Sequence, residues 1–157
     1  MDAPPPFTNR EETFLRALLD EGVEFLVVGL AAASLQGVPA VTQDIDLWFR
    51  DLNDPRLKKA LKRVGAVYVA PTASSPPVFA GEGVALIDIV VHMHGLAAFR
   101  TEARRATRVR VGDLVLKVLP LDRIIASKKA TGRPKDLAIL ETLEDALRVR
   151  KSRRDDR

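Results

Sequence analysis

Three aspartates lie in or at the start of short apolar segments, and their positions limit the folds open to this 157-residue chain. Asp44 and Asp46 open the segment DIDLWFR, and Asp88 lies inside ALIDIVV. A carboxylate among apolar neighbours is costly unless a cation or a hydrogen-bond donor offsets its charge. Side chains two apart on a strand share a face, about 7 Å apart, so the first two aspartates are expected to point the same way.

Short apolar strand patterns alternate with helical patterns along the rest of the chain, which predicts an α/β (α+β) fold with a mixed β-sheet flanked by helices. Strands are expected over 24–28, 44–50, 67–70, 78–80, 84–91, 108–111 and 114–119. Helices are expected from residue 9 to Gly22, over 30–36, from Pro55 to Gly65, over 96–105, over 121–131, and from Pro134 onward.

The composition is that of an ordinary globular protein, with 46% hydrophobic and 29% charged residues. No cysteine is present, which excludes disulfides and thiolate zinc sites. The start, MDAPPPFTNREE, lacks the apolar core of a signal peptide, and no apolar run approaches the roughly 20 residues of a membrane span. A cytoplasmic protein with no membrane partner is expected, with a disordered segment at 1–8, one domain at 9–150 and a basic flexible tail at 151–157.

The aspartates favour a metal-dependent phosphoryl-transfer site. Their spacing suits two divalent ions about 3.5–4 Å apart, and Mg²⁺ prefers a few carboxylates completed by waters and phosphates. A calcium loop is excluded, because its sixth and twelfth positions are Phe49 and Pro55 instead of glycine and glutamate. In the alternative, structural interpretation, Asp44 caps a turn while Asp46 and Asp88 pair with arginines.

An apolar strand ends in Val-Val-Gly29-Leu30, Asp44-Ile45-Asp46 follows, and a third aspartate, Asp88, lies on a later strand. In this order, the residues resemble the DNA polymerase β-type nucleotidyltransferase superfamily. The likeness is closer to its minimal bacterial members of abortive-infection and toxin–antitoxin systems. The segment LPLDRIIASKKATGRPKDLAIL, 119–140, extends the likeness, which covers the chain from residue 23 to about 145.

The resemblance implies a polymerase β-like fold and transfer of a nucleoside monophosphate from a nucleoside triphosphate to a hydroxyl group on RNA, protein or a small molecule. Asp44, Asp46 and Asp88 would hold two Mg²⁺ ions, with Mn²⁺ as a substitute. Nucleotide contacts would come from the glycine turn and from cations near the end of the chain: Gly29, Leu30, Ser34, Lys128, Lys129, Arg133 and Lys135. A cognate toxin or antitoxin partner is also implied.

Departures from that family pattern keep a second hypothesis open, a noncatalytic nucleotide- or protein-binding module. Leu30 stands where glycine or serine is usual. Gln36 and Ala40 stand where similar proteins carry a histidine and a basic residue. These changes predict weakened phosphate binding.

Other side chains with possible chemistry have simpler explanations. His92 and His94 would share the face of Asp88 if its strand extended that far, where they would bind a metal or a nucleotide or simply end the strand. Trp48 either stacks on a base or packs in the core, and packing is the more frequent role. An unspecific phosphate track is the most that the arginine-rich segment supports: Arg100, Arg104, Arg105, Arg108 and Arg110.

Overall fold

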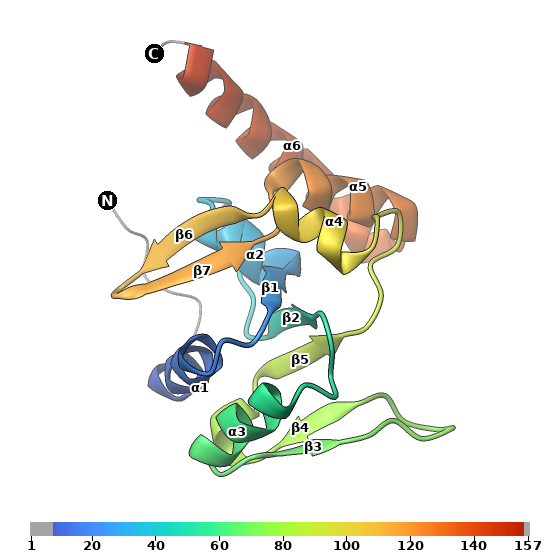
Figure 1. Cartoon of the computed structure of the whole chain (residues 1–157). Helices are drawn as coiled ribbons and strands as arrows, with labels where there is room; N and C mark the ends of the chain where they lie inside the picture. Colours follow the sequence, from blue (N-terminus) through green and yellow to red (C-terminus); the bar gives the residue numbers. More distant parts are fainter. Residues whose placement is uncertain (1–7, 156–157) are drawn as a thin grey trace.

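A computed structural model describes residues 8–155, which form two β-sheets and six α-helices (Figure 1). The helices are α1 (Asn9–Asp20), α2 (Gly29–Leu35), α3 (Pro55–Arg63), α4 (Phe99–Arg104), α5 (Leu121–Thr131) and α6 (Pro134–Asp155), with a 3₁₀ turn η1 (Glu82–Val84). The strands are β1 (Phe25–Val28), β2 (Ile45–Phe49), β3 (Val67–Val69), β4 (Val78–Ala80), β5 (Ile87–Val90), β6 (Thr107–Val111) and β7 (Leu114–Val118).

The main sheet has five strands in the order β5-β2-β1-β7-β6. β1 pairs antiparallel with β2 and parallel with β7, while β2 pairs parallel with β5 and β6 pairs antiparallel with β7. β1 is the central strand, and all four of its residues are buried. The mixed sheet and its flanking helices confirm the α/β (α+β) class expected from the sequence.

Aromatic packing joins the main sheet to α1 and to the small β3–β4 sheet. Phe79 of β4 packs edge-to-face on Phe14 of α1 at 5.6 Å and on Phe49 of β2 at 5.5 Å between ring centroids. Each such pair adds about 0.5–1.5 kcal/mol to the hydrophobic stabilisation. This aromatic cluster holds α1 and the β3–β4 sheet against the main sheet, on the side away from α5 and α6 (Figure 1).

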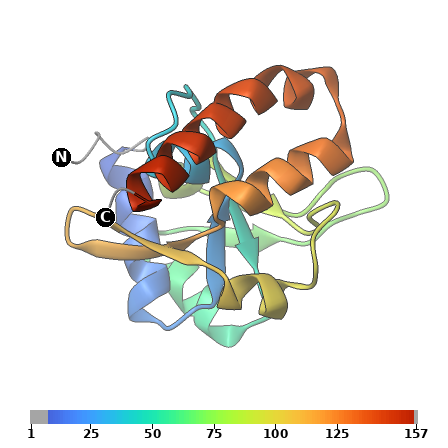
Figure 2. The same ribbon diagram turned by 90° about the horizontal axis from the view of Figure 1, so that it is seen from above.

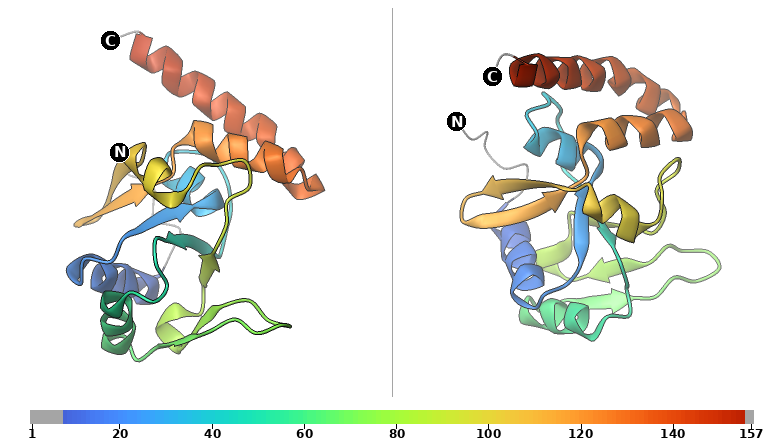
Figure 3. Two further views of the ribbon diagram at one scale, coloured as in Figure 1. Left: turned by 45° about the vertical axis from the view of Figure 1, so that its right-hand side comes forward. Right: turned by 45° about the horizontal axis from the view of Figure 1, so that its top comes forward.

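Those later helices lie at the other end of the molecule, away from α3 and the β3–β4 sheet (Figures 1 and 3). α5 and α6 lie side by side, as the view from above shows (Figure 2). Gly132 turns the chain between them with a left-handed φ of 66°, and its N–H caps α5 through the carbonyl of Lys128. The sequence predicted the bounds of α5 correctly, because its apolar spacing and its C-cap glycine agree.

Three element boundaries differ from the sequence prediction by three residues or more. The strand expected over 84–91 is shorter, because η1 occupies its start and pairing with β2 begins where the Leu86 carbonyl accepts from Ile45 N at 2.8 Å. The helix expected from residue 96 begins at Phe99, after a turn at 94–95. α6 continues through Asp155, so residues 151–155 are helical instead of forming the expected flexible tail.

The expected disorder at 1–8 concerns residues that, apart from Thr8, lie outside the described part of the chain, as do residues 156 and 157. Thr8 is extended and precedes α1. Within residues 8–155, the helices are all too short or too polar to cross a membrane.

Candidate active site

The parallel pairing of β2 and β5 brings two of the aspartates together. Asp46 and Asp88 are register partners, so their side chains point to the same face of the sheet from strands about 4.8 Å apart. Asp44 lies one residue before β2, outside the strand in which the sequence analysis placed it. The expectation that Asp88 is buried among apolar neighbours is wrong, because β5 is an edge strand and leaves the side chain exposed.

Gly29 lies directly against the Asp46 carboxylate. It follows the last residue of β1 and has a left-handed φ of 65°. A methyl group built on Gly29 would lie 2.4 Å from Asp46 Oδ2, far inside van der Waals contact. Glycine is therefore required here for two reasons, its backbone conformation and the close approach of the carboxylate.

Burial and like charge both act on this carboxylate. Partial burial and, after it, repulsion from Asp88 raise the pKa of Asp46 to about 6, although the positive charge of Lys128 opposes both. The pKa of Asp88 is also raised, first by desolvation and then by the charge of Asp44. A cation at this point would relieve the repulsion.

The donor set fits a hard divalent cation that is completed by other ligands. No three histidine, aspartate or glutamate side chains between residues 8 and 155 are gathered closely enough to hold a metal ion by themselves. Mg²⁺ does not need such a cage, because it binds through one or two carboxylates and keeps waters or substrate phosphates as its remaining ligands. Adjacent Asp46 and Asp88, with Asp44 just before the strand, supply carboxylates of that kind.

Two cations are held opposite the carboxylates by a buried acid, Asp136. Its side chain is fully buried and accepts from Lys128 Nζ at 3.0 Å and Arg133 Nε at 2.7 Å. These contacts, led by the Arg133 hydrogen bond, lower the pKa of Asp136 to about 2. Asp136 also accepts from the backbone N–H of Arg133, so one carboxylate both caps α6 and fixes the two cations.

Lys128, Arg133 and Asp46 line one cavity of about 400 Å³ between the sheet and α5. Its complete lining is Val28, Gly29, Asp46, Val90, His92, Met93, His94, Ile124, Ser127, Lys128, Thr131 and Arg133. The two histidines are exposed, and their rings meet edge-to-face at 4.8 Å. They lie in the loop after β5 and not on the strand, which ends at Val90.

Four of the predicted nucleotide contacts lie outside the residues that line this cavity. Lys129 forms an ion pair with Glu144 of α6 at 3.1 Å. Lys135 is exposed in the first turn of α6, from where its charge still lowers the pKa of Asp46. Leu30 and Ser34 are half-buried on α2, Ser34 in its last turn.

Gln36, one of the departures from the family pattern, is a buried structural residue. Its amide nitrogen donates to the carbonyl oxygens of Ala32 at 3.0 Å and Leu119 at 2.8 Å, and its amide oxygen accepts from Arg150 at 3.1 Å. Trp48 is likewise buried, with Phe99 edge-to-face at 5.3 Å, which agrees with a packing role.

The sequence analysis missed Asp136, Ser127 and Thr131 as parts of the site. The signal for Asp136 was present, since Pro134 followed two residues later by an acid marks a helix start. What the sequence did not show is that this capping residue also accepts from Lys128 on the preceding helix.

Solved structures with a similar fold were found, whereas no family model and no curated protein matches the chain. A crystal structure of ANT(2'')-Ia in complex with adenylyl-2''-tobramycin shares 14% identity at a TM-score of 0.58, over 92% of this chain and 95% of that one. A solution structure of the antibiotic-resistance factor ANT(2'')-Ia also shares 14% identity, at a TM-score of 0.57, over 94% and 92%. At this identity the likeness establishes the fold alone, and that fold agrees with the polymerase β-like nucleotidyltransferase fold expected from the sequence.

Replacing Gly29 with alanine is expected to destabilise the protein by about 2–4 kcal/mol, from the left-handed backbone and from the clash with Asp46. Gly65→Ala is the matched control, because Gly65 has a φ of 68° with open space around it, and it should cost only about 1–2 kcal/mol. Denaturant unfolding measures both. The excess cost at Gly29 should vanish in an Asp46→Ala background, and an excess that persists there would contradict the contact.

Asp46→Asn is expected to stabilise the protein above pH 6 when a chelator removes divalent ions. Because the folded pKa of Asp46 is raised to about 6, its charge costs free energy that appears as pH rises from about 4 and is complete above the folded pKa. The variant should gain up to about 3 kcal/mol over this range. Denaturant unfolding at pH 4 and pH 8 measures this, and a variant less stable than the natural protein at pH 8 would refute it.

Asp136→Asn is expected to lower stability at neutral pH by about 2–4 kcal/mol, because it removes the shared partner of Lys128 and Arg133. The folded pKa of about 2 means that this contribution is present above pH 4 and is lost as pH falls toward 2. Glu144→Gln, which removes the partner of exposed Lys129, should cost below about 0.5 kcal/mol. Equal losses of stability in the two variants would show that buried Asp136 contributes no more than an exposed ion pair does.

Proposed function

We propose that this protein is a metal-dependent nucleotidyltransferase, which moves a nucleoside monophosphate from a nucleoside triphosphate to a hydroxyl acceptor. One observation carries the proposal. Asp46, which is paired in register with Asp88, lines a cavity of about 400 Å³ together with the cations Lys128 and Arg133. That volume lies within the roughly 300–1,000 Å³ of small-ligand sites.

The carboxylates are suited to a divalent cation that arrives with the nucleotide. Asp44, Asp46 and Asp88 would hold Mg²⁺, or Mn²⁺ in its place, which would neutralise phosphate charge and acidify the acceptor hydroxyl. The raised pKa values of Asp46 and Asp88 support this assignment, because burial first and carboxylate repulsion second disfavour the charged forms, which a cation would favour. Gly29 keeps the space beside Asp46 free of a side chain.

Lys128 and Arg133 are suited to the phosphates and to the pyrophosphate that leaves. Asp136 occupies one ammonium contact of Lys128 and the Nε and Nη2 groups of Arg133. The remaining N–H groups of both side chains are therefore available to phosphate oxygens. Because Asp136 fixes these cations beforehand, little side-chain entropy would be lost when the triphosphate binds.

A small-molecule acceptor is favoured by the structural neighbours. One of them holds adenylyl-2''-tobramycin, a small molecule that carries a nucleotidyl group, and this chain covers nearly all of both neighbours. An acceptor on RNA or protein and a place in a toxin–antitoxin pair remain predictions of the sequence resemblance. Leu30 was the main argument for a noncatalytic module, and its side chain is not among those that line the cavity.

The test is transfer of label from each of the four α-³²P-labelled nucleoside triphosphates, with Mg²⁺, to RNA, protein or tobramycin. Transfer to one acceptor class is expected, with a loss of roughly 100-fold or more in Asp46→Asn and Asp88→Asn. Asp122→Asn, which alters an exposed carboxylate in the first turn of α5, is the control and should retain activity.

Unfolding would not explain a loss of transfer in Asp46→Asn, because that variant is expected to be the more stable protein at pH 8. Full transfer by Asp46→Asn would contradict the site. No transfer from any nucleotide to any of the three acceptors, combined with Mg²⁺-dependent nucleotide binding, would favour the noncatalytic module.

A further inference from the structure

A second cavity, of about 450 Å³, lies at the other end of β1 from the candidate active site. Phe25 and Leu26 line it, whereas Gly29 follows the opposite end of the same strand, roughly 10 Å away. The remaining walls come from the end of α1, from β6 and β7, and from α4. It shares no lining residue with the cavity of Asp46.

The lining of this second cavity combines an apolar floor with a basic rim. Apolar side chains of β1, β7, α1 and α4 form the floor: Phe25, Leu26, Val115, Leu19, Phe99 and Ala103. Gly22 and Val23 also line the cavity, and four cations and one acid complete the lining: Arg50, Arg100, Arg108, Lys117 and Glu24. A site of this composition suits a ligand with an apolar body and negative charge.

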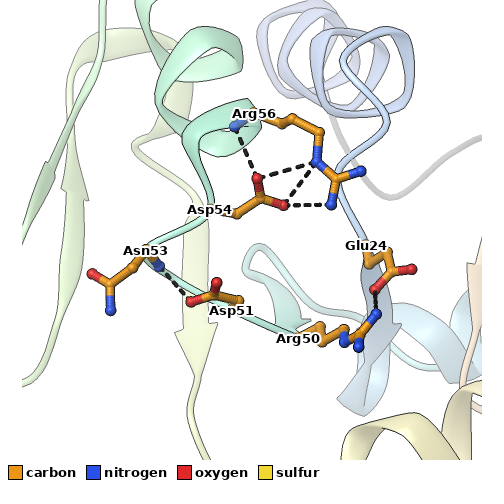
Figure 4. Close-up of polar contacts among 6 residues, drawn as sticks. All are labelled: Glu24, Arg50, Asp51, Asn53, Asp54 and Arg56. Atoms are coloured by element: carbon orange, nitrogen blue, oxygen red, sulfur yellow. Dashed lines mark hydrogen bonds and ion pairs between the residues drawn. The ribbon is translucent and has the colours of Figure 1, made fainter.

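The single acid in the rim is already neutralised. Glu24 accepts from Arg50 Nη1 at 2.6 Å across β1 and β2 (Figure 4). This hydrogen bond lowers the pKa of Glu24, so the carboxylate stays charged and stays paired. The nearby Arg56 is paired with Asp54, which caps α3 (Figure 4). Arg100, Arg108 and Lys117 form no ion pair with any acid of residues 8–155.

The register of β6 and β7 places two of these unpaired cations directly opposite each other. Arg108 pairs with Lys117, and Leu116 and Val118 on either side of Lys117 point into the core. Like charges directly opposite on one face of an antiparallel pair are destabilising. An anion between them would convert this repulsion into two attractive contacts.

We propose that this cavity binds a small organic anion with an apolar body, such as a phosphorylated or carboxylated ring compound. Arg100 and Arg108 would contact the anionic group, since guanidinium groups match phosphate and carboxylate oxygens in pairs, and Lys117 would add a point charge. The ring or chain of the ligand would lie on the apolar floor. This second cavity is separate from the cavity of Asp46, and the proposal does not depend on nucleotidyl transfer.

The test is a calorimetric and fluorescence titration with 8-anilinonaphthalene-1-sulfonate, an aromatic anion, at pH 7 in low salt. Saturable one-to-one binding is expected. The variant Arg108→Gln, Lys117→Gln should weaken it at least tenfold and should be no less stable than the natural protein, because the cross-strand repulsion is gone. The variant Lys58→Gln, Lys62→Gln is the matched control, since it removes the same charge from the exposed face of α3.

Binding to the control should stay within twofold of that of the natural protein. Equal weakening in both double variants would show that net charge alone attracts the probe, and would overturn the proposal. Absence of saturable binding by the natural protein would overturn it as well. Displacement of the probe by phenyl phosphate or benzoate is expected, and the stronger competitor identifies which anionic group the site prefers. Displacement by neither, or full displacement only by Mg²⁺ with a nucleoside triphosphate, which would place the probe in the cavity of Asp46, would overturn the proposal.

Discussion

The contact of the Asp46 carboxylate with the backbone of Gly29 is the constraint on which the site depends. It joins the end of β1, the start of α2 and the middle of the β2–β5 pair at one point. No side chain larger than hydrogen fits there, and the register of β2 and β5 places the same carboxylate beside Asp88. Burial first and repulsion from Asp88 second raise the pKa of Asp46 to about 6, and a cation at this point would favour the charged carboxylate.

Asp136 holds two positively charged side chains in place beside the same cavity. The acid is buried where α5 and α6 pack together, and its contacts with Lys128 and Arg133 keep both cations beside the cavity of Asp46. A divalent cation with a triphosphate would therefore fit between a negative and a positive wall. The same sheet also carries the unpaired cations of the second, mainly basic cavity at the other end of β1.

Much of this arrangement was predictable from local sequence. Alternating strand and helix patterns were enough to predict the fold class, and Asp46 and Asp88 lie side by side on one face of the sheet as expected. The exposure of Asp88 was not predictable, because it depends on the order of strands in the sheet and not on the apolar residues beside it. The partners of Asp136 were missed for the same reason, since they follow from helix packing.

The most direct test of the account is the pKa of Asp46, measured by NMR titration of its carboxyl carbon, with and without Mg²⁺ and a non-hydrolysable nucleoside triphosphate. The account predicts a pKa near 6 in the free protein and a fall toward or below the ordinary value when both ligands are present. An ordinary pKa in the free protein, or a raised pKa that Mg²⁺ and nucleotide leave unchanged, would contradict it.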